Sequence, residues 1–182
     1  MRRALLPALA ALAAAALLGA CGSGGGTTTA APDKVADAEV LNQILGRQTA
    51  AVAAYDHSLR GLGGQALEIA RLFRAQEQEH ADAILKALRR LDAKAEPASE
   101  EISASGLESE AEYLNFLYEL ESATIEAELS GVVKLTSASP RSLLATTAAN
   151  QAQHLVLLRR LLGAKSIETV PAPFENGTTP AP

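Results

Sequence analysis

Aromatic residues and cysteine are scarce in this chain. Tryptophan is absent, aromatic residues make up 3% of the 182 residues, and there is one cysteine. A chain rich in alanine and leucine with so few aromatic side chains favours helices packed through small aliphatic groups over a strand-rich core. The single cysteine excludes an intramolecular disulfide and any metal motif built on paired cysteines. We therefore expect an all-α fold.

Several signatures of function are also missing. The chain contains no glycine-rich phosphate loop before a Lys-Ser/Thr pair and no Gly-x-Ser-x-Gly nucleophile elbow. The formal net charge is −5, and no basic, aromatic-rich surface is expected, so nucleic acid is not an expected partner.

Residues 1–20 have the pattern of a targeting signal. Arg2 and Arg3 precede a run of alanine and leucine that ends in small residues, which is typical of secretory signals. The following Leu18-Gly19-Ala20-Cys21 resembles the lipobox of bacterial lipoproteins, which implies that Cys21 is lipidated and becomes the first residue. Residues 21–33 then form a flexible tether. We expect an exported protein anchored through Cys21 to the extracytoplasmic face of the cell membrane; a plain secretory signal is the alternative.

Four helices are predicted from apolar periodicity and turn residues. They cover about Asp33–Leu59, Gln65–Leu91, Ser109–Leu135, and a last segment from Ser139 to Gly163. The third begins with a capping box, and the fourth with the N-cap Ser139 followed by Pro140. Residues 165–182 are rich in Pro, Gly and Thr and are expected to form an extended tail, in which Phe174 is a candidate anchor onto the helices.

The segment between the second and third helices, residues 92–108, is far longer than a turn requires. At about 3.3 Å per extended residue it could reach roughly 50 Å, whereas a helix of about 27 residues is roughly 40 Å long. The sequence therefore predicts a four-helix bundle over residues 34–164, built from two antiparallel hairpins with one long crossover. A simple up-down-up-down bundle with a long loop is the alternative.

Polar residues interrupt the apolar stripe of each predicted helix near its middle. They are Gln48, Glu77 with His80, Glu121, and Gln151 with His154. Residues i and i+3 of a helix point the same way, so Glu77 and His80 can hold one ion together. Carboxylate oxygens with imidazole nitrogens suit iron or manganese, and zinc as well. We assign Glu121 rather than Glu119 to the inward face, and Tyr55 to the core.

Three stretches of the chain resemble helices of the ferritin-like superfamily, in particular its bacterioferritin and rubrerythrin branch. They are LNQILGRQTAAVAAYDHSL, EQEHADAILKAL and ANQAQHLVLLRRLLG, and the tail VPAPFENG resembles the ending of small bacterial ferritin-like domain proteins. The resemblance covers roughly residues 35–177 and implies a centre of two metal ions with six ligands. Four of the six are retained as Glu77, His80, Glu121 and His154. Gln48 and Gln151 stand where the family has a terminal and a bridging Glu.

Two functions follow from these residues. In the first, the domain binds iron or manganese in the bundle core, one ion rather than two, with Gln48, Gln151 and Tyr55 as weak ligands or supporting groups. In the second, it is a scaffold lipoprotein with a vestigial metal site, acting in envelope structure or protein–protein contact. Histidine nitrogens turned toward the carboxylates would favour the first, and direct pairing of carboxylates with the amides would favour the second. The sequence leaves open whether the protein is an enzyme and whether it forms a homodimer.

Overall fold

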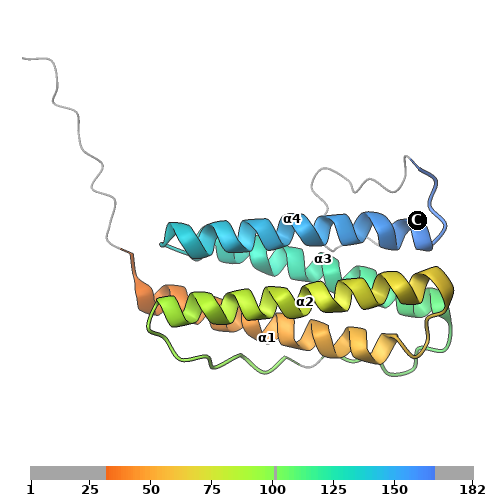
Figure 1. The fold of residues 1–182 in the computed structure, drawn as a ribbon, viewed down its shortest axis with the longest axis horizontal. Coiled ribbons are helices and arrows are strands. Elements are labelled where there is room, and N and C mark those ends of the chain that lie inside the picture. Colours follow the sequence, from red (N-terminus) through yellow and green to blue (C-terminus); the bar gives the residue numbers. More distant parts are fainter. Residues whose placement is uncertain (1–31, 101, 167–182) are drawn as a thin grey trace, which may run out of the picture. The chain divides into compact units, whose positions relative to one another are not determined.

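The computed structural model describes residues 32–100 and 102–166 (Figure 1). In these ranges the chain forms four α-helices: α1 (Lys34–Ser58), α2 (Gly64–Arg90), α3 (Glu110–Lys134) and α4 (Ala138–Leu161). None of the described helices is long and apolar enough to cross a membrane. The predicted signal, Cys21, most of the tether, and the tail from residue 167 with Phe174 lie outside the described residues.

The helices form the predicted all-α four-helix bundle (Figure 1). Helix α1 packs against α2 and α3, and α4 packs against the same two helices. At one end the backbone N–H of Asp33 donates to the Thr136 hydroxyl (2.8 Å). At the other end the N–H of Gly63 donates to the Glu110 carboxylate (2.8 Å). Thus α1 and α3 run antiparallel, and α2 runs parallel to α3 across the bundle.

The long connection between α2 and α3 runs back along α1, which confirms the predicted crossover (Figure 1). The Asn42 side chain accepts a hydrogen bond from the N–H of Glu96 (2.8 Å) and donates to the carbonyl of Lys94 (3.2 Å). A Cβ at Gly46 would lie 2.1 Å from the carbonyl oxygen of Ala98. Because α1 and the crossover approach so closely there, only glycine fits at position 46.

The helix ends agree with the sequence at α3 and differ at α4. Ser109 and Glu112 form the predicted capping box. Helix α4, however, begins at Ala138 after the N-cap Ser137, so the predicted N-cap Ser139 is wrong and lies inside the first turn. The Ser137 side chain makes no capping hydrogen bond. The buried carboxylate of Asp37 instead binds the chain just before α4: it accepts from the N–H groups of Thr136 (2.6 Å) and Ser137 (2.9 Å). A carboxylate from α1 therefore ties the α3–α4 connection to the start of α1.

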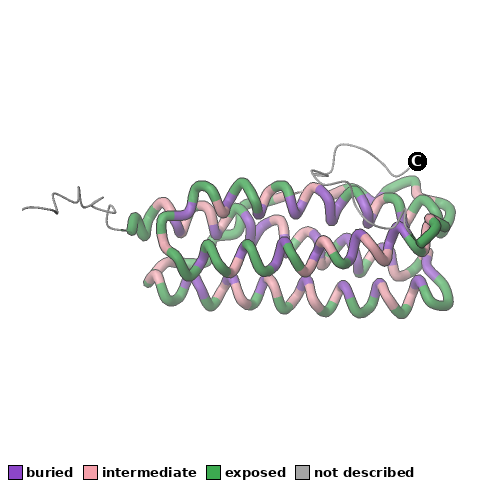
Figure 2. Tube along the Cα trace, turned by 90° about the horizontal axis from the view of Figure 1, so that it is seen from above, coloured by how far each residue is buried: buried purple, intermediate pink, exposed green. Residues whose placement is uncertain are grey.

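The core consists of two apolar clusters with polar side chains between them, and buried positions recur along every helix (Figure 2). One cluster includes Tyr55, Phe73 and Leu117, and the other includes Leu41, Ile84 and Leu144. Truncating one such buried aliphatic side chain to alanine costs roughly 2–5 kcal/mol, so the clusters fix the helix register at both ends. Between them lies the polar layer, which comprises Gln48, Glu77, His80, Glu121, Glu128, Gln151 and His154, and the Tyr55 hydroxyl reaches it from the first cluster.

Candidate metal centre

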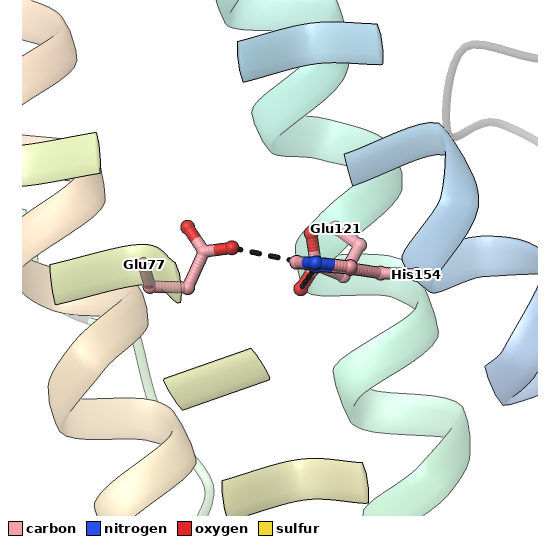
Figure 3. Close-up of side chains that lie close together, drawn as sticks. All are labelled: Glu77, Glu121 and His154. Carbon is pink, nitrogen blue, oxygen red and sulfur yellow. Dashed lines mark hydrogen bonds and ion pairs between the residues drawn. The ribbon is translucent and has the colours of Figure 1, made fainter. Parts of the chain in front are cut away.

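Three side chains from three helices converge inside the polar layer (Figure 3). Glu77 comes from α2, Glu121 from α3 and His154 from α4. Each offers one ligand atom, and these atoms all lie within 4.8 Å of one another. All three residues are at most 1% exposed. Two carboxylates and an imidazole thus share a site that is closed to water.

The His154 ring is held in one orientation. It stacks on Phe73, with ring centroids 3.8 Å apart and 17° between the planes. Its Nε2 donates to the amide oxygen of Gln76 (2.6 Å). An amide oxygen can only accept, so Nε2 carries the hydrogen and Nδ1 of the neutral ring is an acceptor.

The acceptor Nδ1 of His154 faces two carboxylate oxygens. It lies 3.0 Å from Oε1 of Glu121 and 3.5 Å from Oε1 of Glu77. Burial lowers the pKa of His154 to about 4, so the ring is neutral at pH 7. A lone pair that points at two carboxylate oxygens requires a proton or a cation between them.

The two carboxylates of the centre repel each other. Burial, and then the charge of Glu77, raises the pKa of the Glu121 carboxyl well above its ordinary value. The Tyr55 hydroxyl donates to Oε1 of Glu121. Oε2 of Glu121 and Oε1 of Glu77 are buried and have no hydrogen-bond partner among the described residues. These oxygens are free to bind a cation, and leaving them ionised without one would cost several kcal/mol, on the order of that for a buried charge.

His80 and Gln151 contact the edge of the centre through Glu77. Nδ1 of His80 lies 3.5 Å from Oε2 of Glu77. The Gln151 amide donates to that same Oε2 (3.0 Å). Burial alone would lower the pKa of His80, but the hydrogen bond and charge of Glu77 outweigh it and raise that pKa. His80 therefore lies beside the three converging residues without being one of them.

Comparison with known proteins identifies the fold. The model of the ferritin-like domain family matches residues 36–164. The chain belongs to the ferritin-like family. Among curated proteins, none matches this ferritin-like chain.

Two solved structures share the ferritin-like fold at low sequence identity. One is a conserved hypothetical protein, rv2844, from Mycobacterium tuberculosis, with a TM-score of 0.66 and 18% identity over 73% of this chain and 95% of that one. The other is a ferritin-like, diiron-carboxylate protein from Bacillus anthracis, with a TM-score of 0.58 and 20% identity over 71% of this chain and 97% of that one. At these identities the likeness establishes the fold alone.

The residues present fit the metal that this family implies. The buried, unpartnered oxygens of Glu77 and Glu121 and the acceptor Nδ1 of His154 form a donor set of two carboxylates and one imidazole. Such mixed oxygen and nitrogen ligands suit iron or manganese. Glu77, Glu121 and His154 would therefore hold the ion.

The sequence prediction of inward-facing residues agrees with the structure at Glu121 and Tyr55. Glu121 is buried, whereas Glu119 is exposed. Tyr55 is a fully buried core residue, packed edge-on against Phe73, and its hydroxyl also contacts the centre. The feature expected for metal binding is present, because the His154 nitrogen faces carboxylates. The feature expected for a vestigial site is present too, because the Gln151 and Gln48 amides donate to carboxylates.

Glu128 is a further buried polar residue, which the sequence did not predict. This residue is fully buried on α3, and Oε1 of its carboxyl accepts a hydrogen bond from the Gln48 amide (2.9 Å). Burial raises the pKa of the Glu128 carboxyl to about 8. The available signal was its position, two helical turns after Glu121 on the same face. With Glu128, the polar layer of this ferritin-like bundle holds three buried carboxyl groups rather than two.

Proposed function

We propose that this ferritin-like domain binds a transition metal ion, iron or manganese, between Glu77, Glu121 and His154. The observation that carries the proposal is the orientation of His154. Its unprotonated Nδ1 faces carboxylate oxygens at 3.0 and 3.5 Å, and a cation in that position satisfies all three acceptors together.

The charges in the site support a divalent ion. Glu77 and Glu121 carry two negative charges when ionised, which one divalent ion neutralises. Gln151 donates to Glu77, so it supports the carboxylate without adding the negative charge that a glutamate would bring. The site therefore suits one tightly held ion better than two bridged ions.

The surrounding residues have separate roles in holding such an ion. Phe73 and Gln76 fix the His154 ring, as outer partners of metal-binding histidines do. Tyr55 donates to Glu121 and orients that carboxylate. A bound iron or manganese ion would supply Lewis-acid and redox chemistry in a site without bulk water.

The export of this domain is part of the same proposal. The arginine pair, the apolar run and Leu18-Gly19-Ala20-Cys21 support cleavage before Cys21 and a lipid anchor on its thiol. Cell fractionation tests this: the natural chain should remain with membranes, and Cys21→Ala should not acquire lipid. Equal incorporation of a labelled fatty acid into both proteins would contradict the anchor.

Metal analysis tests the binding itself. Protein purified without chelator should carry at least one iron or manganese ion per chain, and Glu77→Ala/His80→Ala should carry only traces. A matched control is Glu79→Ala, because Glu79 is exposed on the same helix and its loss should leave the metal content unchanged. Equal trace metal in all three proteins would overturn the proposal.

A ferritin-like scaffold with a vestigial site is the second candidate. It is favoured by the hydrogen bonds from Gln151 to Glu77 and from Gln48 to Glu128, because these amides bind the buried carboxyl groups of the polar layer without an ion. In that case Gln48→Glu and Gln151→Glu would alter only stability, because no ion is present for the new carboxylates to bind. Stoichiometric metal in the natural protein would refute the scaffold function.

A further inference from the structure

The end of the bundle at which α1 begins also holds the end of α2 and the connection between α3 and α4 (Figure 1). The N–H of Asp33 donates to the Thr136 hydroxyl (2.8 Å). Nζ of Lys34 lies 3.5 Å from Oδ2 of Asp92, which places the end of α2 beside the start of α1. We call this part of the bundle the tether end, and it comprises residues 33–39, 86–96 and 132–141.

Positive charge gathers at the tether end, although the whole chain is acidic. Its three ranges contain seven lysine and arginine residues and five aspartate and glutamate residues, a net charge of +2, whereas the whole chain has −5. Four of the five acidic groups already bind cations or backbone N–H groups; they are Asp33, Asp37, Asp92 and Glu96. The acidic groups therefore offset little of the positive charge that faces solvent.

Several cations of the tether end have no acidic partner. Among the described residues, no salt bridge involves Lys86, Arg89, Arg90 or Lys134, and all four residues are exposed. The helix dipole favours cations in the last turns of α2 and α3, so the charge alone does not identify a partner. A second feature of this end does.

Exposed valines accompany these cations. Val133 is 86% exposed and Val35 is 71% exposed, and each is next in the chain to a lysine, Lys134 or Lys34. Leu129, which is 49% exposed, lies one turn before Val133 on the same face of α3. Of the four large apolar side chains that are exposed among the described residues, three thus lie at this end or one turn from it. The headgroup boundary of an anionic lipid layer accommodates apolar and cationic side chains together.

The tether limits which surface this end can meet. Asp33 follows Cys21 by twelve residues, which allows at most about 40 Å at about 3.3 Å per residue and about 20 Å for a flexible chain. A lipid on Cys21 keeps the tether end close to the membrane, and the opposite end lies a helix length, roughly 40 Å, farther along the bundle. Contacts that are weak on their own become significant at the high effective concentration that such a link produces.

We propose that the tether end docks on an anionic phospholipid surface. The residues that meet the lipid are Arg89, Arg90 and Lys134 at the headgroups and Val35 and Val133 at the boundary with the acyl chains. This inference rests on the lipid anchor of the proposed function, which brings the surface within reach. The last residue of α2 lies thirteen residues beyond Glu77, a rise of about 20 Å. Docking therefore holds the candidate centre at about that height above the headgroups.

Fluorescence of the full mature lipoprotein in vesicles tests the docking. The vesicles contain phosphatidylcholine with or without phosphatidylglycerol, and an environment-sensitive fluorophore is attached at Val133→Cys, because the proposed lipid blocks Cys21. Nitroxides on the acyl chains should quench this label in vesicles with phosphatidylglycerol and much less in phosphatidylcholine alone. The same label at Leu72→Cys is the control, because Leu72 is also exposed but lies eighteen residues before the end of α2. It should remain unquenched in both kinds of vesicle.

Charge reversal tests the role of the cations. Arg90→Glu/Lys134→Glu should lose the quenching while the protein still floats with the vesicles. One cation near an anionic surface contributes about fivefold to binding, so the ratio of docked to undocked protein should fall by at least about 25-fold. Arg71→Glu/Arg160→Glu is the matched control, because it reverses two exposed charges outside the tether end, and it should keep the quenching. Unfolding curves of the variants confirm that each protein is folded.

The outcomes distinguish the docking from the anchor. A lipidated protein that floats with the vesicles while its label at residue 133 stays unquenched would overturn the docking and leave the anchor intact. Equal quenching with and without phosphatidylglycerol, or in Arg90→Glu/Lys134→Glu, would also overturn the proposal. A blue-shifted label without quenching by the lipid would show that a second copy of the chain covers this face instead. A protein that acquires no lipid on Cys21 would overturn the anchor, and the docking with it.

Discussion

Replacing Glu128 with glutamine should stabilise the metal-free protein at neutral pH. The folded state raises the pKa of the Glu128 carboxyl from 4.5 to about 8 because the group is buried. The folded protein therefore retains a proton that the unfolded chain loses above pH 4.5. This contribution to stability is fully present below pH 4.5 and is lost as the pH rises through 8. Glutamine has the shape of the protonated carboxyl and no proton to lose.

The size of the effect follows from the two pKa values. They are about 3.5 pH units apart, and each unit corresponds to about 1.4 kcal/mol. At pH 7 the natural protein should have lost about 3 kcal/mol relative to Glu128→Gln, and above pH 8 about 5 kcal/mol. At pH 5 the two proteins should differ by less than about 1 kcal/mol.

Urea unfolding in the presence of a chelator measures this difference. The free energy of unfolding is determined for both proteins at pH 5, 6, 7 and 8, and Glu119→Gln is the control because Glu119 is exposed. The gap between the natural protein and Glu128→Gln should widen steadily with pH, while the control remains parallel to the natural protein. Parallel curves for Glu128→Gln would refute the argument that Glu128 is held protonated by burial.

Three further substitutions test other parts of the structure. Gly46→Ala should lower the free energy of unfolding by about 1–3 kcal/mol in urea titrations, since its Cβ would meet the crossover backbone at 2.1 Å; an unchanged midpoint would contradict this contact. Asp37→Ala removes the acceptor for the N–H groups of Thr136 and Ser137 and should lower the free energy of unfolding by roughly 1–3 kcal/mol at pH 7. Burial opposes ionisation of Asp37, but its hydrogen bonds outweigh burial and lower its pKa, so this loss should shrink well below pH 3.8. A loss that persists undiminished there would argue against a carboxylate role. Gln76→Leu frees Nε2 of His154 and should weaken metal binding by about 10–100-fold in calorimetric titrations, whereas an unaltered affinity would show that the ring needs no such partner.

The sequence predicts the helices and the crossover well because both depend on local patterns. Apolar periodicity sets each helix to within a few residues, and the capping box at Ser109 needs only residues of the same turn. The length of the 92–108 segment allows a path along the bundle, which the structure confirms over the alternative of a long loop. The connection before α4 is different, because its backbone N–H groups bind Asp37, which lies 99 residues before Thr136 in the chain.

The sequence predicts only part of the candidate centre, because some of its contacts join residues that are far apart in the chain. Glu77, Glu121 and His154 interrupt apolar stripes, so periodicity alone turns them inward. Glu128 was not predicted, because it lies nearer the end of α3 than the polar residues assigned to the middle of each helix. The protonation of His154 depends on Gln76 from another helix, and no pattern within a single helix contains that contact.

An anomalous-scattering map of crystals grown with manganese(II) or iron(II) tests the central claim most directly. We predict a peak within bonding distance of Glu77, Glu121 and Nδ1 of His154, which should vanish in crystals of Glu77→Ala/His154→Ala. A natural protein without a peak there, with His154 still facing the two carboxylates, would contradict it. A proton would then hold those acceptors together.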